Sequence, residues 1–258
     1  MRIALVRGIP DSFSESLKLE VPKTPIHVGR AKEQHGRYVA ELMRLVDRVI
    51  EIPADPRFPD CCFVEDTAVV AGDRAVITRP GAPSRNGEQE QVGVVLGSLG
   101  LATTAMTPPA TLDGGDVLRV GNHVFVGRSS RTNEAGIEQL ARVFCDYQVH
   151  AVPVDYGLHL KSMLSLVGEW NVAVARCPAG ERAAHVIKDK VPDMRFTWLP
   201  DLHAANCLLI GENLIHLAGY PASRGVLEGT GKTLLGLDMG ELEKADGGLT
   251  CLSIVVER

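Results

Sequence analysis

The sequence lacks the features that mark several large classes of protein. Aromatic residues make up only 5% of its 258 positions, and no basic tract interleaved with aromatic residues occurs anywhere along it. Proteins that follow a phosphate backbone carry such tracts, whereas the net charge here is -5 and the isoelectric point is about 5.9. We therefore expect no nucleic-acid partner.

Long apolar runs are also missing. No run approaches the roughly 20 residues that a membrane-spanning helix needs. The N-terminal stretch, Met-Arg-Ile-Ala-Leu-Val-Arg, has neither the long apolar core nor the small-residue cleavage site of a secretory signal. We expect a cytoplasmic protein that has no membrane partner.

Cysteines are few, and their spacing does not match that of a metal site. The six cysteines stand at positions 61, 62, 145, 177, 207 and 251, with no CxxC pair. This spacing resembles neither a disulfide framework nor a structural zinc site, so we expect reduced thiols. The chain is 45% hydrophobic and can bury a large core. The repeats described next favour one catalytic domain over residues 1–258.

Four stretches share one internal pattern: an apolar strand, a glycine followed by a polar residue, and a second apolar strand. Each predicts a β-hairpin, because glycine adopts the positive φ that tight turns need. The four glycines are separated by 49, 47 and 43 positions, which indicates a structural repeat. The stretches are Asp66 to Arg79, Asp116 to Arg128, Met163 to Arg176 and Asn206 to Ala218.

Between the hairpins, apolar residues recur with helical spacing, and a short apolar strand follows each helix. The clearest helical faces lie in residues 39–50, 92–99 and 137–144, and weaker helices are expected near residues 183–187 and 222–232. Short strands are expected at residues 50–53, 102–107, 148–154, 196–199 and 234–237. The repeating unit is therefore ββαβ.

The fifth unit lacks a hairpin partner within its own stretch, because Leu252 to Val256 is its one remaining apolar strand. The unmatched strand Arg2 to Arg7 can supply that partner. Pairing the N- and C-terminal strands in one blade would close the ring and remove exposed sheet edges. The sequence thus predicts an α/β fold, a closed pseudo-fivefold α/β propeller of five ββαβ units, in preference to an open α/β sheet.

Residues 14–29 fit no unit. They carry Pro22, Pro25 and Gly29 among scattered apolar residues. An irregular segment of this length in a compact domain is usually either disordered or functional. We expect an active-site lid loop.

If the units are equivalent, the segment that enters each hairpin lies near the ring axis at the same depth. Each polar residue there has an ordinary alternative, as a turn-capping carboxylate, a half-buried histidine or a small apolar cysteine. Their common position in the repeat favours a shared site over coincidence. These residues are Asp60, Glu65, Asp66, Asp113, Asp116, His159, His203, Asn206 and Cys251.

Three of these residues suit nucleophilic catalysis. A thiolate nucleophile needs a proton shuttle, and an imidazole oriented by a carboxylate supplies one near neutral pH. Cys251, His159 and Asp113 can take these roles.

The remaining charges indicate the substrate. Asp60, Glu65 and Asp66 exceed what a cysteine protease needs, and carboxylates pair with a guanidinium in fixed geometry. Arg85 and Arg131 follow the second strands of their hairpins, where they could either be solvated surface residues or bind a substrate carboxylate. A small molecule with a guanidinium at one end and a carboxylate at the other is an arginine derivative.

Seven segments spread over almost the whole chain match a known family. They are Val-Arg-Gly-Ile-Pro-Asp-Ser at 6–12, Pro-Asp-Cys-Cys-Phe-Val-Glu-Asp at 59–66, Ile-Thr-Arg-Pro-Gly-Ala-Pro-Ser-Arg at 77–85, Leu-Asp-Gly-Gly-Asp-Val-Leu at 112–118, Gly-Leu-His-Leu-Lys-Ser at 157–162, Ala-Ala-Asn-Cys at 204–207 and Glu-Leu-Glu-Lys-Ala-Asp-Gly at 241–247. The sequence resembles the dimethylarginine dimethylaminohydrolases of the guanidine-modifying, or pentein, superfamily, whose members share a five-unit propeller. The resemblance implies hydrolysis of asymmetric Nω,Nω-dimethylarginine or Nω-monomethylarginine to citrulline and dimethylamine or methylamine, with no cofactor.

Carried over position by position, the resemblance implies a catalytic set and a substrate-binding set. Cys251 would be the nucleophile and His159 the general acid and base, with Asp113 orienting the imidazole and Glu65 as the alternative partner. Among the binding residues, the acids would hold the guanidinium and amino groups, the arginines the carboxylate, and the other two the amino-acid end. The substrate-binding residues are Leu17, Asp60, Glu65, Asp66, Arg85, Arg131 and Ala245, the last through its backbone carbonyl.

The implied reaction passes through a covalent thiouronium on Cys251 and requires no metal. A thiolate beside an imidazole is also a partial zinc site, so zinc at Cys251 and His159 is expected as an inhibitor rather than a cofactor. The alternatives are an arginine deiminase or an amidinotransferase of the same superfamily and, more remotely, a noncatalytic propeller that binds other molecules. The sequence does not fix the oligomeric state, and a homodimer is one option.

Overall fold

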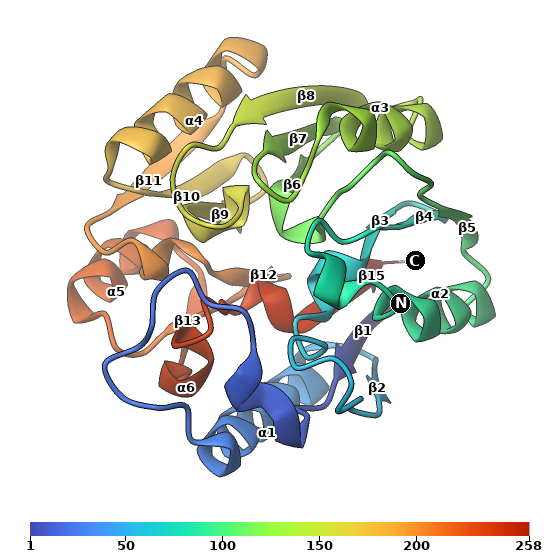
Figure 1. The fold of residues 1–258 in the computed structure, drawn as a ribbon. Coiled ribbons are helices and arrows are strands. Elements are labelled where there is room, and N and C mark those ends of the chain that lie inside the picture. Colours follow the sequence, from blue (N-terminus) through green and yellow to red (C-terminus); the bar gives the residue numbers. More distant parts are fainter. Residues whose placement is uncertain (258) are drawn as a thin grey trace.

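The computed structural model describes residues 1–257, and Figure 1 shows five small sheets placed around a common centre with the helices outside them. Each sheet holds three strands. In every sheet an antiparallel pair of strands is extended by a third strand that runs parallel to the middle one. The ββαβ unit predicted from the repeats is therefore confirmed in all five sheets.

The units follow one another along the chain. Unit 1 holds β3 (Ala68–Ala71), β4 (Arg74–Ile77), α2 (Gln89–Ser98) and β5 (Ala102–Ala105). Unit 2 holds β6 (Val117–Val120), β7 (His123–Arg128), α3 (Glu134–Val143) and β8 (Gln148–Pro153). Unit 3 holds β9 (Leu164–Gly168), β10 (Asn171–Ala175), α4 (Pro178–Lys190) and β11 (Arg195–Leu199). Unit 4 holds β12 (Leu208–Ile210), β13 (Asn213–Leu217), α5 (Pro221–Leu227) and β14 (Thr233–Leu237).

Unit 5 joins the two ends of the described chain. Strand β15 (Ser253–Glu257) pairs antiparallel with β1 (Arg2–Arg7), for example Ile254 with Leu5. The chain then runs through α1 (Val28–Leu45) to β2 (Arg48–Ile52), which lies parallel to β1. The predicted pairing of the terminal strands is confirmed.

Three of the four hairpin turns need glycine for conformational reasons. Gly72, Gly121 and Gly211 have φ angles of 60°, 56° and 60°, in the left-handed region that other residues avoid. The third hairpin differs from the expectation, because Gly168 ends β9 and the turn lies one residue later, at Glu169 and Trp170. A register shift at Asn171 accompanies this change.

Helix boundaries were the least accurate predictions. Helix α1 begins at Val28 and ends at Leu45, so the apolar run expected to continue to residue 50 crosses from a helix into β2. Helix α5 ends at Leu227 and a 3-10 turn follows at Glu228–Thr230, where glycine weakens a longer helix. The short helix α6 (Gly240–Glu243) was not predicted.

The expected lid of residues 14–29 is shorter in the structure. Residues 14 and 15 close the 3-10 turn η1 (Asp11–Glu15), and residues 28 and 29 begin α1. The side chain of His27 caps α1 by accepting a hydrogen bond from Arg30 N, which fixes where the irregular segment ends. Residues 16–27 therefore form the segment without helix or strand.

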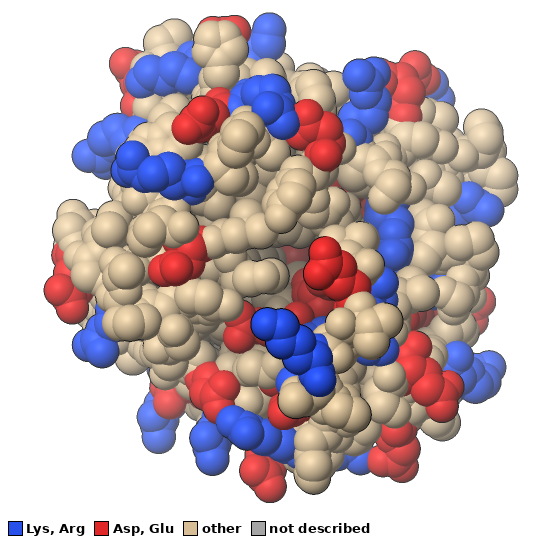
Figure 2. All heavy atoms as spheres, turned by 60° about the vertical axis from the view of Figure 1, so that its left-hand side comes forward, with Lys and Arg blue, Asp and Glu red and all other residues tan. Residues whose placement is uncertain are grey.

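Figure 2 shows positive and negative side chains interspersed on one face of the molecule around a central hollow. Within residues 1–257, no helix combines the length and the apolar character needed to cross a bilayer. All six cysteines carry free thiols.

Candidate active site

A short 3-10 turn precedes the first strand of each unit, and most of the candidate residues lie in these turns or directly beside them. These turns are η2 (Val64–Thr67), η4 (Gly114–Asp116), η5 (Leu160–Ser162), η6 (His203–Ala205) and η8 (Thr250–Leu252). Turn η2 contacts η4 and η8, and η5 contacts η4 and η6. Segments that are far apart in the sequence therefore meet, as the repeat predicted.

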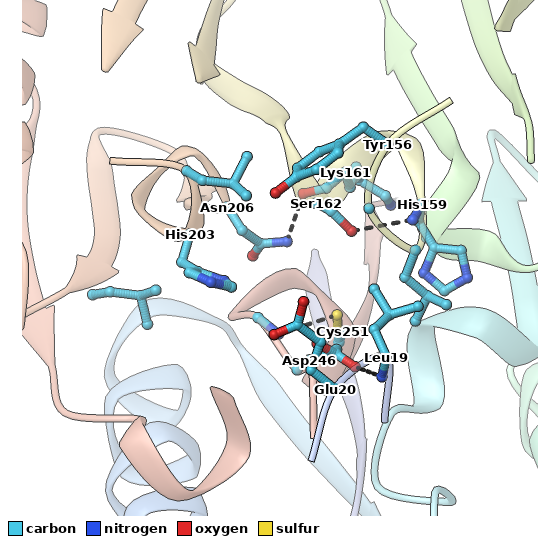
Figure 3. Close-up of a pocket in the computed structure, with 17 residues that line it drawn as sticks. Leu19, Glu20, Tyr156, His159, Lys161, Ser162, His203, Asn206, Asp246 and Cys251 are labelled. Carbon is cyan, nitrogen blue, oxygen red and sulfur yellow. Dashed lines mark hydrogen bonds between the residues drawn. The ribbon is translucent and has the colours of Figure 1, made fainter. Parts of the chain in front are cut away.

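Two adjoining cavities open where the turns meet. The smaller, of about 90 Å³, is bordered by most of the expected site residues: Leu17, Asp60, Asp66, Arg85, Arg131, His159, Ala245 and Cys251. The larger, of about 270 Å³, shares Cys251 and His159 with it and is also bordered by Asn206 and Tyr156. Figure 3 shows that Cys251 and His159 project into the larger cavity from different segments of the chain.

Cys251 lies in η8 and is half-buried. Its Sγ accepts a hydrogen bond from Gly248 N at 3.4 Å. Burial, followed by the charges of Glu65 and Asp66, raises the pKa of the Cys251 thiol to about 12. The thiol is therefore protonated at neutral pH.

His159 immediately precedes η5 and is 4% exposed. Its Nε2 lies 3.0 Å from Asp113 Oδ2, and its Nδ1 lies 4.0 Å from Asp66 Oδ1. Burial alone would lower the pKa of the imidazole, but the charge of Asp66, the bond to Asp113 and the charge of Asp116 raise it to about 9. His159 is therefore an imidazolium at neutral pH.

Asp66 is paired with Arg85 inside the protein. Arg85 Nη1 lies 2.6 Å from Asp66 Oδ2, and the remaining bonds of the guanidinium include Glu88 and the carbonyl of Phe63. Burial favours the neutral acid, but His159 and Arg85 lower the pKa of Asp66 to about 2. Arg85 also borders the smaller cavity.

Four residues expected to bind the amino-acid end of the substrate also border the smaller cavity: Leu17, Asp60, Arg131 and Ala245. Asp60 is 5% exposed and accepts a hydrogen bond from Leu17 N at 3.1 Å. Burial raises the pKa of its carboxyl group, against the lowering charge of Arg85. Arg131 Nη1 lies 3.9 Å from Asp113 Oδ2, and Ala245 is buried.

Glu65 is paired with residues of two neighbouring units. It borders neither cavity beside the sulfur, and its two carboxylate oxygens contact Lys161 Nζ and Thr250 Oγ1. It borders a third cavity, of about 470 Å³. Neighbouring units therefore bond both oxygens, and the contact of Glu65 with the substrate stays a prediction. Of the two carboxylates considered as the partner of His159, Asp113 makes the contact and Glu65 does not.

Several neighbouring residues were missed or left without a role. Lys161 and Thr250 pair with Glu65, and Asn206 bonds to both of their segments. Asp246 accepts a hydrogen bond from Leu19 N of the irregular segment at 2.6 Å. The available signal was position: Lys161 follows His159 by two residues, and Thr250 directly precedes Cys251.

One group of described residues has the spacing to hold a metal ion, namely Asp66, Asp113 and His159. Cys251 is not part of it, so the ligand pair expected for zinc differs from this group. Arg85 and Arg131 already lie beside its two carboxylates, which weakens it as a cation site.

Comparisons with known proteins identify the family of this chain. The arginine deiminase family model matches residues 12–166. The Streptomyces coelicolor protein named N(G),N(G)-dimethylarginine dimethylaminohydrolase is 37% identical over 97% of this chain and 95% of its own. The Pseudomonas aeruginosa protein of the same name is 33% identical over 90% of this chain and 92% of its own.

A solved structure extends the comparison to three dimensions. A cysteine-to-serine mutant of the Pseudomonas aeruginosa enzyme, complexed with citrulline, superposes with a TM-score of 0.90 at 30% identity and with 98% of each chain covered. The likeness includes the five three-stranded sheets. The chain therefore belongs to the dimethylarginine dimethylaminohydrolases, within the arginine deiminase family.

Proposed function

We propose that this chain hydrolyses asymmetric Nω,Nω-dimethylarginine and Nω-monomethylarginine to citrulline and dimethylamine or methylamine. The observation that carries the proposal is the smaller cavity, which a thiol, an imidazole, three acids and two arginines border together. Relatives named for this activity support it over most of the chain.

The charges of the cavity suit a substrate with a cation at one end and an amino acid at the other. Asp66 pairs with the guanidinium, and Asp60 with the α-amino group. Arg85 and Arg131, which border the same cavity, bind the α-carboxylate. Leu17 and the carbonyl of Ala245 contact the amino-acid end.

The protonation states of Cys251 and His159 indicate that the positive charge of the substrate helps to form the thiolate. The thiol of Cys251 is neutral because burial, and then the charges of Glu65 and Asp66, raise its pKa. A bound guanidinium offsets those carboxylates and favours the thiolate beside it. The thiol proton goes to solvent as the substrate binds, and the sulfur takes a proton back from solvent when the product leaves. His159 is already protonated and serves as the general acid in the first half-reaction.

In the first half-reaction the thiolate of Cys251 attacks the guanidinium carbon and forms a neutral tetrahedral adduct. His159 donates its proton to the dialkylated nitrogen, the C–N bond breaks, and dimethylamine leaves. The carbon remains bonded to sulfur as a cationic thiouronium, and His159 is now neutral.

In the second half-reaction neutral His159 takes a proton from water, whose oxygen bonds to the same carbon. Collapse of this second adduct breaks the C–S bond and returns the electron pair to sulfur. Citrulline leaves after its protonated urea oxygen loses a proton to solvent. Asp113 holds the imidazole throughout and balances its charge.

The proposal extends to the whole chain, residues 1–258, as one catalytic domain in a closed ring. Packing supports the closure, because neighbouring units share buried apolar clusters. These clusters unite Ile77 with Leu5, Val76 with Val124, Leu118 with Leu164 and Leu214, and Ile215 with Val6. The irregular segment around Leu17 acts as the lid. A homodimer, a cytoplasmic location and inhibitory zinc at Cys251 and His159 stay predictions.

Parallel assays test the proposed activity. The purified protein is incubated separately with dimethylarginine, monomethylarginine, arginine, and arginine with glycine as an amidine acceptor. Citrulline and dimethylamine from dimethylarginine, with little turnover of arginine and none in Cys251→Ser, are expected. Faster citrulline release from arginine would identify a deiminase instead, and amidine transfer to glycine would identify an amidinotransferase.

A further inference from the structure

We propose that Asn206 and Thr250 are positioning residues that hold the nucleophile turn and the histidine turn at a fixed separation. They do so through a closed ring of hydrogen bonds that includes Glu65 and Lys161. The inference rests on the proposed function in one respect, that Cys251 is the nucleophile.

The ring can be followed bond by bond. Asn206 Nδ2 donates to Lys161 O at 3.0 Å and to Thr250 Oγ1 at 3.1 Å. Thr250 Oγ1 donates to Glu65 Oε2 at 2.8 Å, and Glu65 Oε1 accepts from Lys161 Nζ. Lys161 thus enters the ring twice, through its carbonyl and its ammonium group. The four residues come from units 1, 3, 4 and 5.

The amide of Asn206 has one orientation that satisfies these bonds. Its Oδ1 accepts from Thr250 N at 2.9 Å, while both N–H groups of Nδ2 point to acceptors. Reversing the amide would set its oxygen against the carbonyl of Lys161 and its nitrogen against Thr250 N. Asn206 is 5% exposed and Thr250 6% exposed, so water cannot readily replace either partner.

Glycine at position 248 allows the nucleophile loop to lie against this amide. A Cβ atom on Gly248 would come within 2.4 Å of Asn206 Cγ, closer than such atoms approach in proteins. The amide therefore occupies the space that a side chain would need, and it fixes the loop that leads to Cys251 by contact as well as by hydrogen bonds.

The ring joins the two reacting groups indirectly. Thr250 directly precedes Cys251 in η8, and Lys161 belongs to η5, which begins just after His159. Asn206 bonds to both turns but borders only the larger cavity. It therefore acts on the distance and orientation between sulfur and imidazole, where a misplacement of about 1 Å can cost about 100-fold in rate.

The test compares substitutions that differ by one group in the ring. Thr250→Ser keeps the hydroxyl, and Thr250→Val replaces it by a methyl group of similar size. Asn206→Ala opens the ring at another bond and leaves the ion pair of Glu65 and Lys161 in place. Thr197→Val is the matched control, because Thr197 Oγ1 makes one hydrogen bond, to Asn171, in outer strand β11.

Two readouts separate positioning from a loss of folded protein. Chloroacetamidine, a cationic electrophile whose chloride the thiolate displaces as a C–S bond forms, gives the number of reactive sites and the rate at which they react. Turnover of dimethylarginine is then expressed per reactive site, alongside KM. A wild-type protein that is alkylated at Cys251 but does not hydrolyse dimethylarginine would contradict the proposed function, while the alkylation rates would still test the ring.

In Thr250→Val and Asn206→Ala, the alkylation rate and the turnover of dimethylarginine, each expressed per reactive site, are expected to fall 10-fold or more. KM should change less than about threefold. Thr250→Ser and Thr197→Val should stay within about threefold of the wild type. Equal rates per reactive site in Thr250→Val and Thr250→Ser would overturn the inference. If Thr250→Val does not fold, Asn206→Ala takes its place in this comparison. Equal rates per reactive site in Asn206→Ala and Thr250→Ser would then overturn the inference.

Discussion

The imidazole Nε2 of His159 lies 3.0 Å from Oδ2 of Asp113, and the two side chains are 4% and 0% exposed. Asp113 is itself held, because its Oδ1 accepts a hydrogen bond from Gly81 N at 2.8 Å. This contact joins units 2 and 3 and sets both the orientation and the proton affinity of the proposed general acid.

Asp113→Asn should shift the pH dependence of kcat to lower pH. Asp113 is one of the groups that raise the pKa of His159 to about 9, so the wild type keeps its general acid until the pH passes that value. In the variant the imidazole loses its proton at lower pH, and the alkaline decline in kcat should move with it. Exposed Asp73→Asn is the control, and an unchanged alkaline limb in Asp113→Asn would contradict the assignment.

Cys251 should be alkylated at different rates by charged and uncharged reagents, because its thiol is neutral. Because its pKa is raised to about 12, alkylation by neutral iodoacetamide should keep rising with pH well beyond 9. Cationic chloroacetamidine should react much faster than iodoacetamide near pH 7, since its charge offsets Asp66. Peptide mapping measures both rates, with exposed Cys145 as the reference in the same sample. Equal pH profiles for the two reagents would argue against assistance by a bound cation.

Arg85 and Arg131 should behave differently when truncated. Arg85→Ala would leave Asp66 and Glu88 buried without their partner, a change that typically costs about 3–5 kcal/mol of folding free energy. Arg131 is only half-buried and its nearest carboxylate is 3.9 Å away, so Arg131→Ala should mainly raise KM, by about 10-fold or more. Thermal denaturation and steady-state kinetics of both variants check this division, and a stable Arg85→Ala protein would refute it.

Asp246 should control how the lid is held. Its φ of 56° is a backbone conformation that glycine and asparagine adopt readily, so Asp246→Gly removes the carboxylate without strain. Loss of the bond to Leu19 N should speed hydrogen exchange in residues 17–24 and raise KM severalfold. Asp246→Asn keeps an oxygen acceptor and serves as the control; if the two variants exchange at the same rate, the carboxylate does not latch the segment.

The sequence was most informative where a periodic pattern determined the structure. Alternating apolar residues around Gly72, Gly121 and Gly211 located three hairpins, and the unmatched strand at Arg2 found its partner near the other end of the chain. The common phase of the units also brought His159 and Asp113 together. These results depend on repeats that a single sequence displays.

The sequence was least informative about which side chains the buried carboxylates pair with. Glu65 and Asp66 are adjacent in one turn, yet Glu65 pairs with Lys161, 96 positions away, and Asp66 pairs with Arg85. Which partner each carboxylate takes depends on the rotation of a single 3-10 turn and on side chains from other units. Neither composition nor spacing records that rotation, so the ring through Asn206 and Thr250 could be recognised only in three dimensions.

The most direct test of the proposed chemistry is mass spectrometry of the protein quenched in acid during turnover of dimethylarginine. We expect the peptide containing Cys251 to carry the amidine carbon of the substrate as a thiouronium. The other five cysteines should be unmodified, and Cys251→Ser should carry no adduct. Steady release of citrulline while Cys251 stays unmodified at every time point, or an adduct on another cysteine, would contradict it.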